Sequence, residues 1–188
     1  MEHLLELAKR NQERAWEVIR QTDIINIWKS VGAEINLVGS LNMGLLMKHK
    51  DIDFHIYTSP FRISDSFQAM ARLAENPLIK RIEYGNSLDT EERCVEWHAW
   101  FQDPNNELWQ IDMIHIRNFE KMAERITAVL TDETRQAILK LKYETPDTAK
   151  IMGVEYYLAV IQDGVRTYAE LEDWKKQHPV TGVIEWIP

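Results

Sequence analysis

The chain has a single cysteine, Cys94, among its 188 residues. One thiol cannot form an internal disulfide or supply the ligand set of a structural zinc site, so the sequence fits a reducing compartment. Long apolar runs are also missing: the longest dense patch is 156–161, far short of a membrane span. Residues 1–14 mix both charge signs and lack the apolar segment of a secretion signal. We therefore expect a cytoplasmic protein with no membrane partner.

Basic residues are in deficit. The chain carries 22 Lys and Arg against 30 Asp and Glu, which gives a formal net charge of −8. Binding along a phosphate backbone needs a basic footprint, so this balance argues against a long nucleic acid as partner. It leaves room for a small anionic substrate in a local site. The hydrophobic share of 45% with seven Trp is enough for a core, which excludes general disorder.

Several common motifs are absent as well. The sequence contains no GxxxxGK[ST], no GxGxxG, no GxSxG and no HExxH. These absences exclude the simplest P-loop, dinucleotide-binding, serine-hydrolase and zinc-protease interpretations. Function must therefore be sought in a less familiar arrangement.

The hydrophobic pattern predicts an α/β (α+β) fold. Residues 2–29 carry apolar side chains at helical spacing, which indicates one long amphipathic helix. The segment 79–116 is typical of an antiparallel meander, and the pattern becomes helical after residue 117. We expect an α/β core with its N-terminal helix at 1–117 and a helical C-terminal part at 118–188. The predicted strands are 34–38, 51–57, 79–84, 95–102 and 108–116, and the remaining predicted helices are 64–75, 119–130, 132–143, 148–163 and 169–177.

The stretch 37–54, LVGSLNMGLLMKHKDIDF, has the residues to hold a metal-bound phosphate. A strand ends before Gly39, which allows a tight turn, and Ser40 offers a hydroxyl beside free backbone N–H groups. Asp51 and Asp53 share one face of the next strand, with Cα atoms about 6.6 Å apart. Two such carboxylates repel each other unless a cation lies between them, and Mg²⁺, or Mn²⁺ in its place, prefers these oxygen ligands.

A third acid lies on a later strand. In LWQIDMIH, Asp112 is the one acid in an otherwise apolar and probable central strand. A buried carboxylate is costly without a partner, so we expect Asp112 either to form a buried salt bridge or to act as a metal ligand. Three acids on adjacent strands beside a phosphate-holding turn are what a two-metal phosphoryl or nucleotidyl transfer centre requires.

These residues resemble the DNA polymerase β-like nucleotidyltransferase superfamily. The resemblance extends over residues 34–115 and implies a mixed twisted sheet flanked by helices. The segment 101–115, FQDPNNELWQIDMIH, is nearest in appearance to the small antibiotic-modifying nucleotidyltransferases. The residues that carry the resemblance are Gly39-Ser40, Gly44, Asp51-x-Asp53 and Asp112.

The resemblance also implies roles for single residues. Gly39 and Ser40 are expected to hold the triphosphate of an NTP, and Asp51 and Asp53 to bind both metal ions. Asp112 is expected to bind the metal ion that activates the acceptor hydroxyl. The implied reaction moves an NMP from an NTP, with ATP as the expected donor, to a hydroxyl of a small molecule or protein, and it releases pyrophosphate.

Two positions depart from the superfamily pattern and favour an alternative. Met43 and Lys50 stand where many members have a phosphate-contacting residue or a hydroxyl. The alternative is a catalytically inactive module of the same fold that binds a nucleotide or a protein partner. The sequence leaves the oligomeric state open.

Several residues near the site have two interpretations. His55 either borders the site or forms a local hydrogen bond at the strand edge. His98 and Trp100 face the same way as Glu96 and could line an acceptor or base pocket, although Trp100 could equally cap the sheet. His115 is expected in the core. Glu155 is one of several candidates for an acceptor-side base.

Overall fold

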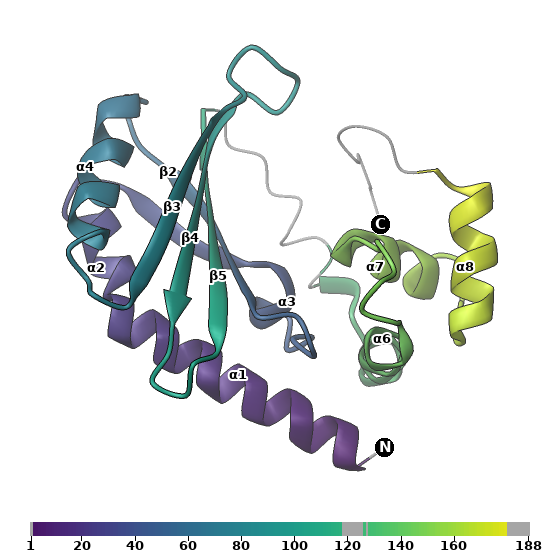
Figure 1. Ribbon diagram of the computed structural model, residues 1–188. Coiled ribbons are helices and arrows are strands. Elements are labelled where there is room, and N and C mark those ends of the chain that lie inside the picture. Colours follow the sequence, from purple (N-terminus) through teal and green to yellow (C-terminus); the bar gives the residue numbers. More distant parts are fainter. Residues whose placement is uncertain (1, 118–125, 127, 180–188) are drawn as a thin grey trace.

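The computed structural model describes residues 2–117, 126 and 128–179, and it has helices on both sides of one sheet (Figure 1). The sheet order is β1-β2-β5-β4-β3. Only β2 and β5 run parallel to each other, while the other neighbours are antiparallel. The predicted mixed sheet and the meander of its last three strands are therefore confirmed. The strands are β1 (Glu34–Val38), β2 (Asp51–Tyr57), β3 (Ile79–Asn86), β4 (Cys94–Gln102) and β5 (Leu108–Ile116).

One face of the sheet is buried beneath three helices. Along β2, β4 and β5, buried residues alternate with partly exposed ones, as the period of two in a strand requires. The buried members pack on α1 (Glu2–Thr22), α2 (Ile24–Lys29) and α4 (Ile63–Leu73). We call this cluster the sheet core; its largest fully buried side chains include Trp28, Phe54, Phe101 and Trp109. The opposite face, here called the open face, carries the polar partners of the alternation.

A second cluster lies beyond the open face. The helices α6 (Asp132–Glu144), α7 (Gly153–Ile161) and α8 (Tyr168–Gln177) lie on the side of the sheet away from α2 and α4 (Figure 1). Their buried side chains pack together with Ala8 of α1 and with Met43, Leu45 and Met47. We call this cluster the helical core. The predicted division after residue 117 stays a prediction, yet the N-terminal part clearly contributes residues to the packing of the later helices.

The helix predicted over 2–29 is interrupted. Asp23 has φ of 53° in the left-handed region, which ends α1 and begins α2 in a new direction. Its Oδ1 accepts a hydrogen bond from Asn26 Nδ2 at 2.7 Å. Short polar side chains tolerate this backbone conformation better than most. The break allows both helices to follow the same sheet face, so that Ile24 and Trp28 are fully buried.

The third C-terminal helix also begins later than predicted. Residues 148–152 are not helical, and α7 begins at Gly153. Glu155 Oε2 accepts from the backbone N–H of Met152 at 2.6 Å, and its Oε1 lies 2.9 Å from Lys175 Nζ. The carboxylate therefore fixes the first turn of α7. The helix predicted at 119–130 falls largely outside the described residues. Among the helices that the structure describes, none has the length and hydropathy of a membrane span.

Candidate active site

The turn after β1 is packed directly against the metal-binding candidate Asp53. Gly39 has φ of +67°, and a Cβ at this position would lie 2.0 Å from Asp53 Oδ2. Val38, the last residue of β1, is the register partner of Asp53. Only glycine satisfies both the backbone conformation and the close approach. Ser40 follows in the short helix α3 (Gly39–Asn42), where its side chain is buried.

The three predicted aspartates lie on two adjacent strands. Asp51 and Asp53 share the open face of β2, and Asp53 is the register partner of Asp112 in the parallel β2–β5 pair. Neighbouring strands lie about 4.8 Å apart, so these two carboxylates start from adjacent backbone positions. The structure therefore brings together the residues that the sequence selected, with the Gly39 turn on the far side of Asp53.

The electrostatics of this group call for a cation. Burial, followed by the charges of Asp51 and Asp112, raises the pKa of Asp53 from its ordinary value of 3.8 to about 7, and the Lys142 ammonium offsets part of this rise. Asp51 Oδ1 is buried and has no hydrogen-bond partner among the described residues. An orphaned carboxylate oxygen beside repelling carboxylates matches the oxygen ligands that Mg²⁺ and Mn²⁺ prefer. The donor set thus fits a divalent metal ion.

Asp112 has two partners that the sequence analysis did not identify. His98 Nδ1 lies 2.6 Å from Asp112 Oδ1, and Gln110 Nε2 donates to the same oxygen at 2.9 Å. On its other side, His98 Nε2 lies 3.7 Å from Glu96 Oε2. The antiparallel register sets His98 opposite Asp112. The tight turn at 103–107 joins β4 to β5 and so fixes this register; its residues were the sequence signal that could have predicted the pairing.

A lysine from the helical part reaches the turn at Gly39 and Ser40. Lys142 Nζ donates to Ser40 Oγ at 2.7 Å, and the Tyr157 hydroxyl lies 3.1 Å from the same oxygen. Lys142 is only 8% exposed, and no carboxylate of the described residues lies within salt-bridge distance of it. Its charge acts on Asp53, yet no carboxylate of the described residues is bonded to it directly, and a bound phosphate would supply such an anion. Nothing in the spacing of α6 pointed to this lysine, because its approach to Ser40 depends on the tertiary fold.

Three other candidates, His115, Trp100 and Glu155, have partners outside the group of aspartates. His115 is fully buried with Nε2 2.9 Å from the Thr58 hydroxyl, and burial lowers its pKa to about 4, so its predicted core position is confirmed. Trp100 lies under the Arg81 guanidinium, which is 4.5 Å from the ring centroid. Burial lowers the pKa of His55. Glu155 is 1% exposed and caps α7, which gives it a structural role.

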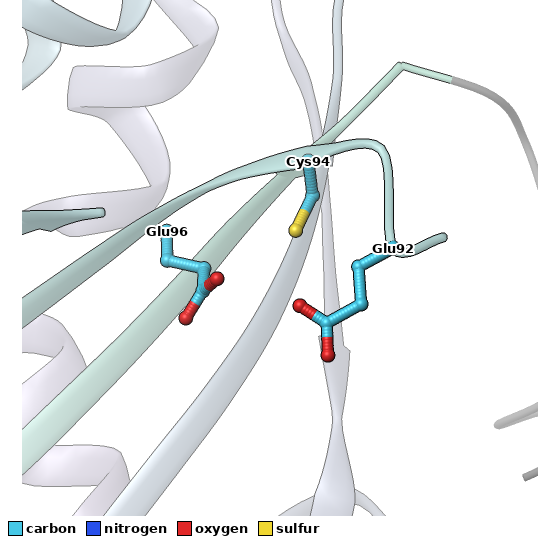
Figure 2. Close-up of side chains that lie close together, drawn as sticks. All are labelled: Glu92, Cys94 and Glu96. Atoms are coloured by element: carbon cyan, nitrogen blue, oxygen red, sulfur yellow. The ribbon is translucent and has the colours of Figure 1, made fainter. Parts of the chain in front are cut away.

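A second acidic group lies at the start of β4. The ligand atoms of Glu92, Cys94 and Glu96 are all within 4.8 Å of one another, with the sulfur pointing between the two carboxylates (Figure 2). Burial, and then the charges of Glu96 and Glu92, raise the pKa of the Cys94 thiol to about 11. Glu96 Oε1 also accepts from Ser87 Oγ at 2.5 Å, and we assign no metal to this group.

No family model and no curated protein sequence matches the chain. Solved structures do match its fold. A cytoplasmic RNA terminal U-transferase superposes with a TM-score of 0.53 at 14% identity, over 85% of this chain and 51% of that one. The MgGTP-bound Cid1 poly(U) polymerase gives 0.57 at 16% identity, over 82% and 55%. The non-canonical poly(A) polymerase complex GLD-2–GLD-3 gives 0.57 at 13% identity, over 95% and 64%.

These similarities show that the chain has a nucleotidyltransferase fold. It spans about half to two-thirds of the length of the three structures. One is named an RNA terminal U-transferase, and the other two are named a poly(U) and a poly(A) polymerase. None is named as an antibiotic-modifying enzyme, so the similarity to that group stays a prediction.

Proposed function

We propose that the chain is a metal-dependent nucleotidyltransferase that moves an NMP from an NTP to an acceptor hydroxyl and releases pyrophosphate. The observation that carries this proposal is the register pairing of Asp53 with Asp112, beside the orphaned Asp51 Oδ1 and the Gly39 turn. An arrangement of repelling carboxylates destabilises the empty site, and a metal ion would remove that cost. The fold of the structural neighbours is consistent with this chemistry.

The donor triphosphate is proposed to bind beside the group formed by Ser40, Lys142 and Tyr157. Lys142 and the Tyr157 hydroxyl both lie within hydrogen-bond distance of Ser40 Oγ, so a phosphate entering here meets two donors and one buried positive charge. Charge-assisted hydrogen bonds to phosphate are about twice as strong as neutral ones. We expect ATP as the donor, and the contacts around Ser40 support a place for its phosphates and not for its base.

Asp51, Asp53 and Asp112 are proposed to hold Mg²⁺ or Mn²⁺. When bound, the metal would neutralise phosphate charge and make the acceptor hydroxyl more acidic. The acceptor hydroxyl loses its proton to solvent as its oxygen forms a bond to the α-phosphorus, while the bond from that phosphorus to the pyrophosphate oxygen breaks. The protein contributes position: Gly39 brings the phosphate turn against Asp53, and the strand pair fixes Asp112 beside it.

For the acceptor we propose a hydroxyl of a small molecule or protein, because the net charge of −8 opposes a polyanion. The structural neighbours do not support excluding a long nucleic acid, since they are named as an RNA terminal U-transferase, a poly(U) polymerase and a poly(A) polymerase. An RNA 3′ end is therefore the second acceptor class to test.

The inactive alternative depended on Met43 and Lys50. Met43 is buried in the helical core, and Lys50 Nζ lies 2.8 Å from Glu107 Oε1. These contacts give both departures a role in packing or ion pairing, and neither removes an acid from the site. This supports the enzyme over the binding module.

The test is pyrophosphate release from each of the four NTPs with Mg²⁺ or Mn²⁺. Parallel reactions contain no acceptor, a panel of small polyols and amino sugars, a protein extract, or a single-stranded RNA. Asp53→Asn is the matched variant, because it keeps the side-chain shape and removes the charge. Metal-dependent release that is lost in Asp53→Asn supports the proposal. NTP binding without release under any condition supports the inactive module, and equal release by Asp53→Asn contradicts the site.

A further inference from the structure

We propose that His98 is a positioning residue that sets the carboxylate of Asp112 for metal binding. This inference rests on the proposed function, because it assumes that Asp112 is a metal ligand. The two side chains face each other across the antiparallel β4–β5 pair on the open face. Their 2.6 Å contact is short for a nitrogen–oxygen hydrogen bond, as expected when the acceptor is charged.

The bonds to Asp112 use one of its two oxygens. A carboxylate only accepts, so Nδ1 of His98 carries the proton and donates to Oδ1. Gln110 Nε2 donates to the same oxygen from the same strand as Asp112. Two donors from two strands fix the plane of the carboxylate and occupy the lone pairs of Oδ1. Oδ2 is thereby left as the oxygen available to a metal ion.

Glu96 lies on the side of the His98 ring opposite to Asp112. The ring Nε2 lies 3.7 Å from Glu96 Oε2, and the other oxygen of Glu96 accepts from the Ser87 hydroxyl at 2.5 Å. At this distance Glu96 accepts no hydrogen bond from His98, so the ring keeps the tautomer with its proton on Nδ1. Ser87, Glu96, His98 and Asp112 therefore form a row from the β3–β4 loop to the site. These contacts explain the position of Glu96 next to Cys94 without a second metal ion.

The consequence of losing His98 is a loosely held ligand. Without it, Asp112 keeps one donor from Gln110 and can rotate. Removing a partner of this kind from a metal ligand typically costs about 10- to 100-fold in metal affinity or activity. Because His98 touches neither the triphosphate-holding Ser40 nor Lys142, the KM for NTP should change far less than kcat.

The experiment measures Mn²⁺ affinity directly, by electron paramagnetic resonance of the full chain without NTP or acceptor. His98→Ala removes the donor. His98→Asn places an amide N–H close to the position of Nδ1 and so keeps the donor. Gln102→Ala is the control, because Gln102 lies on the same face of β4 but donates to Asn106 at 2.6 Å. Circular dichroism and the melting temperature verify that each variant is folded.

We expect His98→Ala to weaken Mn²⁺ binding by about 10-fold or more, His98→Asn to stay within about threefold of wild type, and Gln102→Ala to match wild type. In turnover assays, His98→Ala should lower kcat and leave the KM for NTP nearly unchanged. Equal Mn²⁺ affinity in His98→Ala and wild type overturns the inference while the proposed function stands. Equal loss in His98→Asn and His98→Ala also overturns it. A wild-type chain that binds no Mn²⁺ overturns the proposed metal site and, with it, the role of His98.

Discussion

Replacing Asp53 by Asn should make the metal-free protein more stable, and only at neutral to alkaline pH. Asp53 is held among Asp51 and Asp112, and its pKa is about 7 in the native state against 3.8 ordinarily. Between these two pH values the native state keeps a proton that the unfolded chain has released. The stability that the proton brings is complete below about pH 4 and is lost as the pH rises through 7. Wild type should therefore weaken over this range.

The magnitude follows from the size of the shift. A difference of three pKa units corresponds to about 4 kcal/mol, since each unit is worth about 1.4 kcal/mol. Asp53 is partly exposed, and solvent screening lowers the expected value to about 2 kcal/mol. Asn has nearly the same shape and cannot ionise, so Asp53→Asn should exceed wild type in free energy of unfolding by about 2 kcal/mol at pH 8, and by little at pH 4.5.

Urea denaturation followed by tryptophan fluorescence measures this difference. The titrations are run with EDTA at pH 4.5 and pH 8, and the difference between the two proteins cancels groups that titrate in both. Asp89→Asn provides the control, because it makes the same substitution at an exposed position outside the site. Mg²⁺ or Mn²⁺ at pH 8 should then stabilise wild type but not Asp53→Asn. A stability difference that is the same at both pH values refutes the argument that repulsion and burial strain Asp53.

Three further outcomes test other parts of the site. Gly39→Ala should destabilise the protein by about 2 kcal/mol or more and abolish NTP binding, measured by thermal shift, because its Cβ would collide with Asp53 Oδ2 and its φ is positive. Lys142→Met should raise the Kd for NTP by about 10-fold or more, since it removes a charged phosphate donor; unchanged NTP affinity would contradict the placement of the phosphates. His115 stays neutral in the native state down to about pH 4, whereas the unfolded side chain takes up a proton near pH 6.5, so this group costs stability as the pH falls between those values. Urea titrations of His115→Gln in the Asp53→Asn background should show that this acid-side loss disappears.

The sequence predicted the parts of the fold that depend on local pattern. All five strands lie within two residues of their predicted bounds, because alternation and turn chemistry are local signals. The break at Asp23 was missed, since a helix-compatible sequence adopts the left-handed conformation there to follow the sheet. The late start of α7 was missed for a similar reason: the carboxylate of Glu155, which was considered for catalysis, caps the helix instead.

The candidate site shows the same division. Asp51 and Asp53 share a face because they are two residues apart on one strand, which any sequence analysis detects. Asp112 pairs with Asp53 because β5 lies next to β2 in the sheet. The order of the strands along the sequence does not predict that neighbour. Lys142 lies about a hundred residues from Ser40 in the sequence, and the contact depends on how the helical core packs on residues 43–47.

That packing has a thermodynamic consequence. The loop between Ser40 and β2 contributes Leu45 and Met47 to the helical core, and Lys142 of α6 reaches back to Ser40. An NTP bound beside Ser40 should bind the state in which α6 is packed on residues 43–47, and not a state in which α6 has opened locally. Its binding should therefore slow amide hydrogen exchange in α6. The coupling works in both directions with equal free energy. Substitutions that loosen α6 against residues 43–47 should therefore weaken NTP affinity from a distance, without touching an atom of the nucleotide.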